Sequence, residues 1–158
     1  KIVPQAAKRL GKDYLFRIIG DGGTKLLLQQ KMEELQVENV ELINPVSRAE
    51  LLEYYHQSTF LFLHLNDLEA FKKVLPSKLF EYGVCKPVIA GVGGYAARFV
   101  EENLPNHILF SPTNVDEFVD KLTRYKLVFE ERKSFKETFS RKKIMVNMAN
   151  DILKTVSI

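Results

Sequence analysis

The sequence predicts an α/β fold, a three-layer α/β/α domain with a mostly parallel sheet. Short apolar runs alternate about five times with helical patterns, which is typical of successive βαβ units. Several of these runs end in glycines, as expected where a strand turns into a helix. The run from Thr59 to Leu65 is nearly all apolar, which predicts a strand covered by helices on both faces.

Each element follows from this alternation. The first helix is expected to end at Gly11, a typical C-terminal stop. Ser47 and Glu50 have the spacing of a capping box, so a helix is expected to begin there. The strands are expected at 16–19, 40–43, 59–65, 87–90 and 107–110, and the other helices at 24–35, 77–82, 95–102, from 114 onward, and at about 135–156.

Composition limits the function classes. A chain of 158 residues with 46% hydrophobic residues can form one domain with a sizeable core, residues 1–158. No run reaches the roughly 18 apolar residues of a membrane span. A single cysteine, Cys85, rules out an intrachain disulfide and indicates a reducing, cytoplasmic setting. The start at Lys1, without Met or a leader, predicts a fragment of a longer protein.

Charge is unevenly distributed along the chain. The net charge of +3 is too small to indicate nucleic acid. Residues 121–143, however, hold nine Lys or Arg and three Glu. This basic stretch has two interpretations, a surface for an anionic membrane or phosphate-rich partner, and a solvated helix face.

The first candidate ligand site is the turn Gly20-Asp21-Gly22-Gly23 after the first strand. Ligands of open α/β sheets bind at the carboxyl ends of strands, and glycines let backbone amides approach an anion. The turn lacks the third glycine of a dinucleotide fingerprint, because position 25 is Lys. The alternative is a tight turn that needs a positive φ angle.

The second candidate site is the predicted helix start at Ser77. The free amides of Ser77, Lys78 and Leu79 and the lysine charge would suit a phosphate. Glu81 lies one turn further on the same helix face, where its carboxylate could accept from two vicinal hydroxyls, as on a ribose. The alternative is a glutamate that stabilises the helix dipole and binds nothing.

The third candidate site is the glycine turn after the fourth strand. Gly91, Gly93 and Ala96 match G-x-G-x-x-A, which raises the possibility of NAD. That interpretation needs an acidic residue after the next strand, and Ser111 and Pro112 stand there instead. Gly93 and Gly94 also remain candidates for contact with a phosphate or sugar.

The fourth candidate site is the long polar loop 66–75. Asp67 and Glu69 in this loop are either ligands or solvated charges. His64, at the end of the apolar strand, either points into the ligand crevice or is a satisfied residue at the core edge. Cys85 is interpreted as a packed thiol, and no His or Cys cluster has metal-ligand spacing.

These sites together resemble a known family. The order and spacing of the segments are similar to the donor-binding, C-terminal half of group 1 (family 4) GT-B glycosyltransferases, and most similar to capsule and O-antigen enzymes. The resemblance covers about residues 1–125. The segments that carry it are FRIIGDG (16–22), NV (39–40), LLEYY (51–55), PSKLFEY (76–82) and KPVIAG (86–91).

The resemblance implies roles for particular residues. It places Gly20 and Gly22 near the nucleotide, Ser77 and Lys78 at the diphosphate, and Glu81 at the ribose. The family has a first glutamate eight positions earlier that contacts the donor sugar, and this sequence has Lys73 there. The family's Arg/Lys pair that neutralises the diphosphate is absent, or only Lys1 remains of that region.

The resemblance implies a Rossmann-like domain, one half of a GT-B enzyme, that binds a UDP- or GDP-sugar without a metal or other cofactor. The acceptor-binding half would be a separate N-terminal domain, on which the helix at about 135–156 packs. The expected role is transfer of a glycosyl group to a saccharide or lipid-linked acceptor in bacterial surface polysaccharide synthesis. The fragment alone is expected to be inactive. The alternatives are a sugar-nucleotide epimerase and a non-catalytic nucleotide-binding module.

Overall fold

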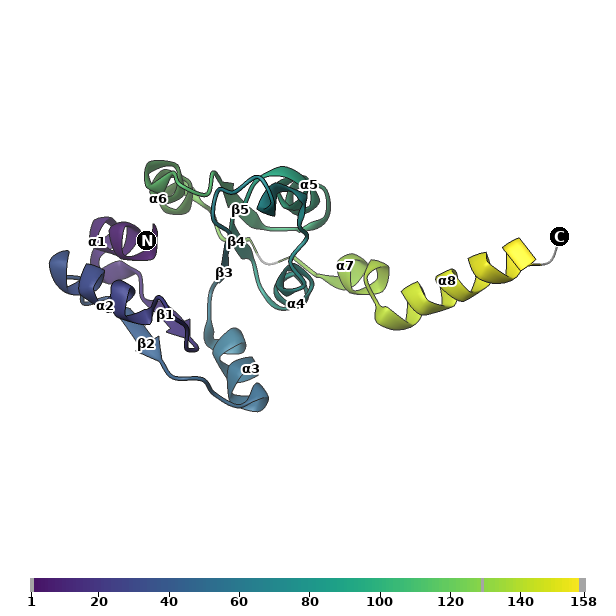
Figure 1. Ribbon diagram of the computed structural model, residues 1–158, viewed down its shortest axis with the longest axis horizontal. Coiled ribbons are helices and arrows are strands. Elements are labelled where there is room, and N and C mark those ends of the chain that lie inside the picture. The colour runs from purple at the N-terminus through teal and green to yellow at the C-terminus, as the bar shows by residue number, and fades with distance from the viewer. Residues whose placement is uncertain (1, 129, 157–158) are drawn as a thin grey trace.

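The computed structural model covers residues 2–128 and 130–156 (Figure 1). The helices are α1 (Ile2–Leu10), α2 (Lys25–Glu34), α3 (Arg48–Gln57), α4 (Lys78–Cys85), α5 (Gly94–Asn103), α6 (Val115–Arg124), α7 (Lys133–Thr138) and α8 (Arg141–Val156). The strands are β1 (Phe16–Ile19), β2 (Val40–Ile43), β3 (Leu61–His64), β4 (Val88–Gly91) and β5 (His107–Phe110). Short 3-10 helices span Gly11–Asp13 and Phe71–Lys73.

Every strand pair is parallel, which confirms the predicted sheet type. The five strands nevertheless form two sheets, β1-β2 and β3-β4-β5, with β4 in the centre of the larger one. Phe16 lies opposite Val40 in the small sheet, and Leu61 lies opposite Val88 in the large one. β1 contacts the larger body through its side chains, since the Phe16 ring meets Phe118 edge-on with centroids 6.5 Å apart.

The larger sheet is covered on both faces, so the predicted three-layer arrangement is confirmed there. Odd and even residues of a strand point to opposite faces. Val88 and Ala90 of β4 belong to one core cluster, with side chains of α4 and α5. Ile89 belongs to the other cluster, with side chains of α1 and α6 such as Phe118. Figure 1 shows β3, β4 and β5 at the centre of this body.

The prediction that the strand within 59–65 is buried on both faces is confirmed only in part, since Leu61 and Leu63 belong to one core cluster while Phe60 and Phe62 are partly buried against the other. In β3 only Leu61 and Leu63 are buried, while Phe62 and His64 are half-buried. Continuous burial belongs to β4, all four residues of which are buried. Among the described residues, β4 has a hydrogen-bonded strand on each side, whereas β3 has one on one side only.

The helix expected over 135–156 is two helices. Phe135 of α7 is buried, and Phe139 packs against Phe80 and Phe99 with centroids 5.3 Å apart in each pair. Arg132 donates to the carbonyls of Gly83 (2.8 Å) and Pro105 (3.2 Å), and its burial lowers its pKa. After Ser140 the chain turns into α8, which has no buried residue in its described part and projects away from the body (Figure 1).

Candidate functional site

The turn after β1 is an open glycine turn. Gly20 has φ +135°, in the region that favours glycine, and its amide donates to the carbonyl of Ile43 (2.9 Å). Asp21 accepts from the Gly22 amide through Oδ1 (2.9 Å), so this carboxylate folds onto its own turn. A side chain at Gly22 would meet no atom within 4 Å. A ligand can therefore come close to the backbone of this turn.

The turn after β1 is tied to the segment that follows β2. Lys25, the first residue of α2, donates from Nζ to Oδ1 of Asn44 (2.8 Å). Three residues beyond Asn44, Ser47 and Glu50 form the predicted capping box, which confirms that helix start. Hydrogen bonding to Ser47 lowers the pKa of Glu50. The carboxyl end of β2 thus leads to a capped start of α3, and Lys25 joins the start of α2 to the same segment.

The start of α4 differs in detail from the predicted cap. Ser77 is the N-cap residue, but its backbone is helical and its hydroxyl makes no capping bond. The first turn is tight, with the Leu79 amide donating to Pro76 (3.0 Å) and the Phe80 amide to Ser77 (3.1 Å). The Leu79 side chain is fully buried in the core, whereas Ser77 and Lys78 are exposed. The two exposed residues are therefore the ones a ligand can reach from solvent.

Glu81 is joined to α3 by an ion pair that the sequence analysis missed. Its Oε1 lies 3.0 Å from Nη2 of Arg48, and the two side chains are 40% and 62% exposed. Hydrogen bonding to Glu81 and its negative charge raise the pKa of Arg48. A sequence signal existed, since Arg48 is the first residue of α3, where a cation opposes the helix dipole.

A tyrosine pair lies beside this ion pair. The rings of Tyr55 and Tyr82 meet edge-on with centroids 5.4 Å apart. Burial, and then the neighbouring Tyr55, raise the pKa of Tyr82 well above its usual range. Burial also raises the pKa of Tyr55. The contact between α3 and α4 therefore has a neutral, buried part and a charged, exposed part.

The glycine turn after β4 serves packing. A side chain at Gly91 would collide with the rings of His64 and Phe110. Gly94 has φ +62°, and a side chain there would collide with the backbone of Lys72. The 3-10 helix Phe71–Lys73 thus packs against the start of α5, while Gly93 has only a distant contact with Lys72. These packing requirements explain Gly91 and Gly94 without a dinucleotide.

His64 is held at the core edge. Its Nε2 lies 2.5 Å from the carbonyl oxygen of Pro112 and therefore carries the donating hydrogen. Its ring stacks on Phe62 and Phe110, with centroids 6.3 and 6.4 Å away. Of the two interpretations offered for His64, the structure favours a histidine at the core edge whose ring is hydrogen-bonded within the protein.

The polar loop after β3 is neutralised internally. Nζ of Lys72 lies 2.5 Å from Glu69 and 3.9 Å from Asp67, and the hydrogen bond to Glu69, together with its charge, raises the pKa of Lys72. Both carboxylates are exposed, and Lys73 is exposed beside them. Within residues 2–128 and 130–156, no three His, Cys, Asp or Glu side chains form a group that could hold a metal ion.

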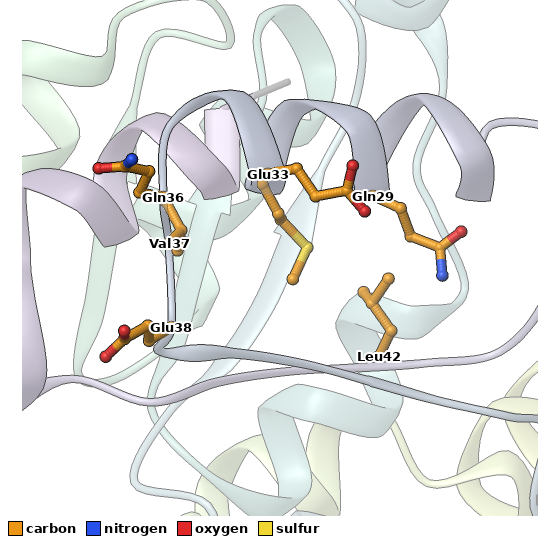
Figure 2. Close-up of a pocket in the computed structure, with 7 residues that line it drawn as sticks. Gln29, Glu33, Gln36, Val37, Glu38 and Leu42 are labelled. Carbon is orange, nitrogen blue, oxygen red and sulfur yellow. The ribbon is translucent and has the colours of Figure 1, made fainter.

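Two surface hollows lie away from these turns. Figure 2 shows one between α2 and β2, where Glu33 and Glu38 would repel a phosphate. The other lies where β3 and β4 begin, at the opposite edge of the sheet, and is lined in part by Cys85, Lys86 and Arg132. Neither hollow includes a predicted ligand residue. Cys85 is free and half-buried, consistent with a packed thiol.

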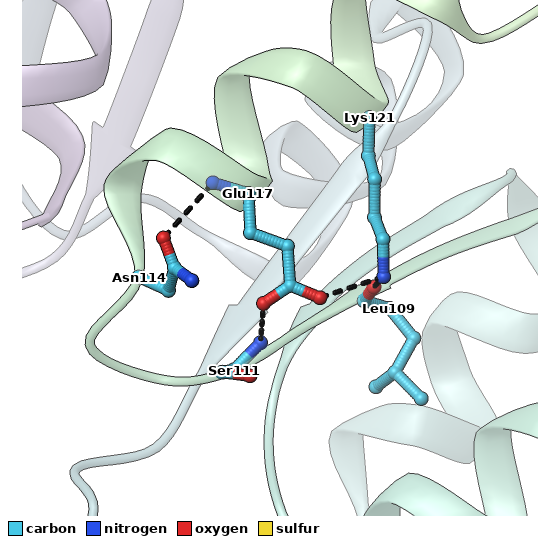
Figure 3. Close-up of polar contacts among 5 residues, drawn as sticks. All are labelled: Leu109, Ser111, Asn114, Glu117 and Lys121. Carbon is cyan, nitrogen blue, oxygen red and sulfur yellow. Dashed lines mark hydrogen bonds and ion pairs between the residues drawn. The ribbon is translucent and has the colours of Figure 1, made fainter.

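The carboxyl end of β5 is closed by the protein's own side chains. Glu117 accepts from the Ser111 amide (2.9 Å) and from Nζ of Lys121 (2.7 Å), while Asn114 caps α6 by accepting from the Glu117 amide (3.0 Å; Figure 3). The hydrogen bond from Lys121 lowers the pKa of Glu117. Of the segments at the carboxyl ends of the strands, the ends of β1 and β2 and the start of α4 therefore remain open to a ligand.

Residues 1–142 match the family described as glycosyl transferases, group 1. The match spans most of the 158 residues. The chain belongs to the group 1 glycosyltransferases. Its reaction class is therefore glycosyl transfer, and its fold is one half of a GT-B enzyme.

Searches of curated proteins and of solved structures returned no match for this group 1 domain. None of its described helices is both long enough and apolar enough to cross a membrane. Lys1, which the resemblance relates to the diphosphate-neutralising pair, lies outside the described residues.

Proposed function

We propose that this domain binds the nucleotide part of a UDP- or GDP-sugar donor. The proposed reaction is transfer of the sugar to a saccharide or lipid-linked acceptor in bacterial surface polysaccharide synthesis, of the capsule or O-antigen type. Membership of group 1 supports glycosyl transfer. The donor and the pathway are supported by the resemblance carried by the segments 16–22 and 76–82.

The observation that carries the proposal is the position of Glu81. Its carboxylate is 40% exposed, one turn into α4, and next to the start of α3. A carboxylate has two oxygens, so it can accept hydrogen bonds from both hydroxyls of a ribose. In the proposed complex Gly20 and Gly22 face the nucleotide, and Ser77 and Lys78 contact the diphosphate.

The proposed chemistry needs stabilisation of a leaving diphosphate. Negative charge grows on this group as the sugar–oxygen bond breaks. The start of α4 carries the positive end of a helix dipole, and Lys78 adds a full charge on exposed side-chain atoms. This arrangement supports a reaction without a bound metal.

We also propose that α8 packs on an N-terminal, acceptor-binding domain. Its apolar side chains Ile144, Met148 and Ile152 recur every four residues and are 48%, 50% and 55% exposed. Side chains at this spacing share one helix face. When the acceptor-binding domain is added, amide hydrogen exchange in α8 is expected to become slower. Unchanged exchange despite complex formation would contradict the proposal.

Lys73 favours a second candidate, a nucleotide-binding module without sugar turnover. It stands where the family's first glutamate contacts the donor sugar, and Asp67 and Glu69 are paired with Lys72. This candidate predicts nucleotide binding without transfer, even when the acceptor domain is present. Transfer by the two-domain enzyme would exclude it.

Calorimetric titration of the chain with UDP, GDP and NAD tests the main proposal. We expect UDP or GDP to bind with a dissociation constant of about micromolar to millimolar, because binding orders mobile groups and this domain forms one side of the proposed cleft. Glu81→Ala is expected to weaken binding roughly 10- to 150-fold, since hydrogen bonds to a charged group contribute about 1.5–3 kcal/mol. Glu101→Ala, an exposed glutamate of α5, is the matched control.

Binding of NAD alone would overturn the proposed donor class. An unchanged affinity in Glu81→Ala would overturn the ribose assignment. In either case the chain would still belong to group 1, since that conclusion does not depend on Glu81.

A further inference from the structure

Arg48 occupies an unfavourable place for a cation. It is the first residue of α3, where the helix dipole favours negative charge. The cap of α3 is supplied by Ser47 and Glu50, so the helix does not need Arg48 for its start. Arg48 also has no role in the core, because its side chain is 62% exposed. Arg48 forms its ion pair with Glu81, on another helix.

The geometry directs Arg48 at Glu81. Arg48 and Tyr55 are seven residues apart, which is about two helical turns, so both lie on the face of α3 that meets α4. Tyr55 contacts Tyr82, the residue next to Glu81. The buried tyrosine contact and the ion pair thus join the same two helices, with Arg48 3.0 Å from Oε1 of Glu81.

We propose that Arg48 is a positioning residue that holds the Glu81 carboxylate ready for the ribose hydroxyls. This rests on the proposed function, in which Glu81 contacts the ribose. The guanidinium occupies one lone pair of Oε1, so Oε2 and the other lone pair of Oε1 remain available to accept from the two ribose hydroxyls. A glutamate side chain has several rotatable bonds, and fixing it before binding lowers the ordering cost when the nucleotide arrives.

The proposal differs from a merely structural role in a measurable way. If Arg48 acts through Glu81, its removal weakens binding only of ligands that carry ribose hydroxyls. If Arg48 only supports the fold, or contacts the phosphates itself, its removal weakens binding of every nucleotide equally. The ratio of affinities for a nucleotide and its 2′,3′-dideoxy form separates these cases.

The test is titration of the chain with UDP, GDP and their 2′,3′-dideoxy analogues. For the nucleotide that binds, Arg48→Ala is expected to lower affinity about fivefold and to leave the dideoxy affinity within about twofold. Arg48→Lys should restore part of the loss, because it keeps the charge but not the fork of donors. Arg124→Ala removes an exposed arginine paired with Asp120 (2.7 Å) and is the matched control.

Glu81→Gln and the double variant that combines it with Arg48→Ala complete a double-mutant cycle. We expect Arg48→Ala to add less than twofold in the Glu81→Gln background. Equal losses for the ribose and dideoxy ligands in Arg48→Ala, or additive losses in the double variant, would overturn the positioning role. If Glu81→Gln leaves the ribose preference unchanged, the proposed contact of Glu81 with the ribose fails first, and the role of Arg48 falls with it. Melting temperatures within about 2 °C of the parent show that the variants are folded.

Discussion

The two sheets of this domain are built from strands of equal length but are buried very differently. Each strand has four residues. In β4 all four are buried, whereas β1 has no fully buried residue and β2 has only Val40. α2, which lies beside the smaller sheet in Figure 1, also has no buried residue. Apolar strand composition alone therefore does not decide where the core forms.

The turns that follow β1 and β4 differ in the same way. The turn at Gly20–Gly22 is surrounded by open space, while Gly91 and Gly94 are enclosed by His64, Phe110 and Lys72. An open glycine turn leaves room for a ligand, and an enclosed one is required by its own neighbours. The contrast teaches that a glycine motif after a strand indicates a ligand only where the protein itself leaves the space free.

The largest effect is expected from the aromatic core of the larger sheet. Phe110 is 1% exposed and stacks on Phe118 with centroids 4.7 Å apart. Phe110→Ala is expected to lower the free energy of unfolding by about 3–5 kcal/mol, through lost contacts and a cavity. Phe16→Ala in β1, a half-buried position, should lower it by about 1–2 kcal/mol. Urea denaturation measures the free energy of unfolding of both variants. Equal losses would contradict the difference in burial between the two sheets.

The glycine turns provide a second pair of variants. Gly91→Ala is expected to lower the free energy of unfolding by about 1–3 kcal/mol, because the methyl group collides with the His64 and Phe110 rings. Gly22→Ala should change it by less than about 0.5 kcal/mol, since nothing lies within 4 Å. Thermal unfolding of the two variants gives the measurement. A larger loss in Gly22→Ala would show that the first turn is not open.

Glu117 makes the closed end of β5 sensitive to acid. Because Lys121 lowers its pKa below the ordinary 4.5, the folded state binds this proton less readily than the unfolded chain. The resulting stabilisation is fully present above about pH 5 and is lost as the pH falls through the folded pKa. Glu117→Gln is expected to lower the melting temperature at pH 7 by about 2–4 °C and to flatten its acid dependence.

The control for this acid effect is Glu41→Gln in the smaller sheet. Glu41 pairs with Arg17 at 2.8 Å on a more exposed surface, with side chains 48% and 37% exposed. Exposed pairs contribute little, so its acid dependence should match that of the parent. An acid profile of Glu117→Gln identical to the parent's would contradict the role of Glu117.

The smallest effect is expected from the basic stretch 121–143. Lys121, Arg124 and Arg132 have partners within the domain. The remaining six cations are exposed: Lys126, Lys133, Lys136, Arg141, Lys142 and Lys143. We expect weak binding to vesicles containing phosphatidylserine, at about 1 kcal/mol for each lysine or arginine near the surface.

Reversing the charge of Lys136, Arg141 and Lys142 tests this weak binding. The variant should lose vesicle binding in sedimentation assays, and added salt should abolish binding of the parent. The same reversal at Lys8, Lys12 and Lys31, exposed or half-buried residues of the other region, serves as control. Binding that is independent of salt and lipid charge would contradict the membrane interpretation.

Local patterns predicted the elements well. The capping box at Ser47 and Glu50, the stop at Gly11 and the alternation of strands and helices depend on neighbours within a few residues, and all are found in the structure. The C-terminal region was predicted as one helix because Ile144, Met148 and Ile152 keep helical spacing. The structure has two helices there: α7 is held by buried Phe135 and by Arg132, which donates to Gly83, a residue far away in the sequence, whereas α8 has no buried residue in its described part.

The candidate site was predicted only in part. The positions of Glu81 and of the Gly20–Gly22 turn follow from strand ends and helix spacing. The closure of the turns by His64, Lys72 and Glu117 could not be predicted, because it depends on side chains that meet across elements. Arg48 was missed for the same reason, since its partner lies 33 residues along the chain.

The sequence by itself determined the fold class, the order of the elements and the segments shared with group 1 glycosyltransferases. Periodicity, caps and glycine turns act over one or two helical turns, and these signals can be read directly along the chain. Only the tertiary structure decided which strand is fully buried, which glycine turns stay open and which cation meets Glu81. Those outcomes depend on long-range packing and charge pairing, where the energy of a contact is set by its neighbours in space.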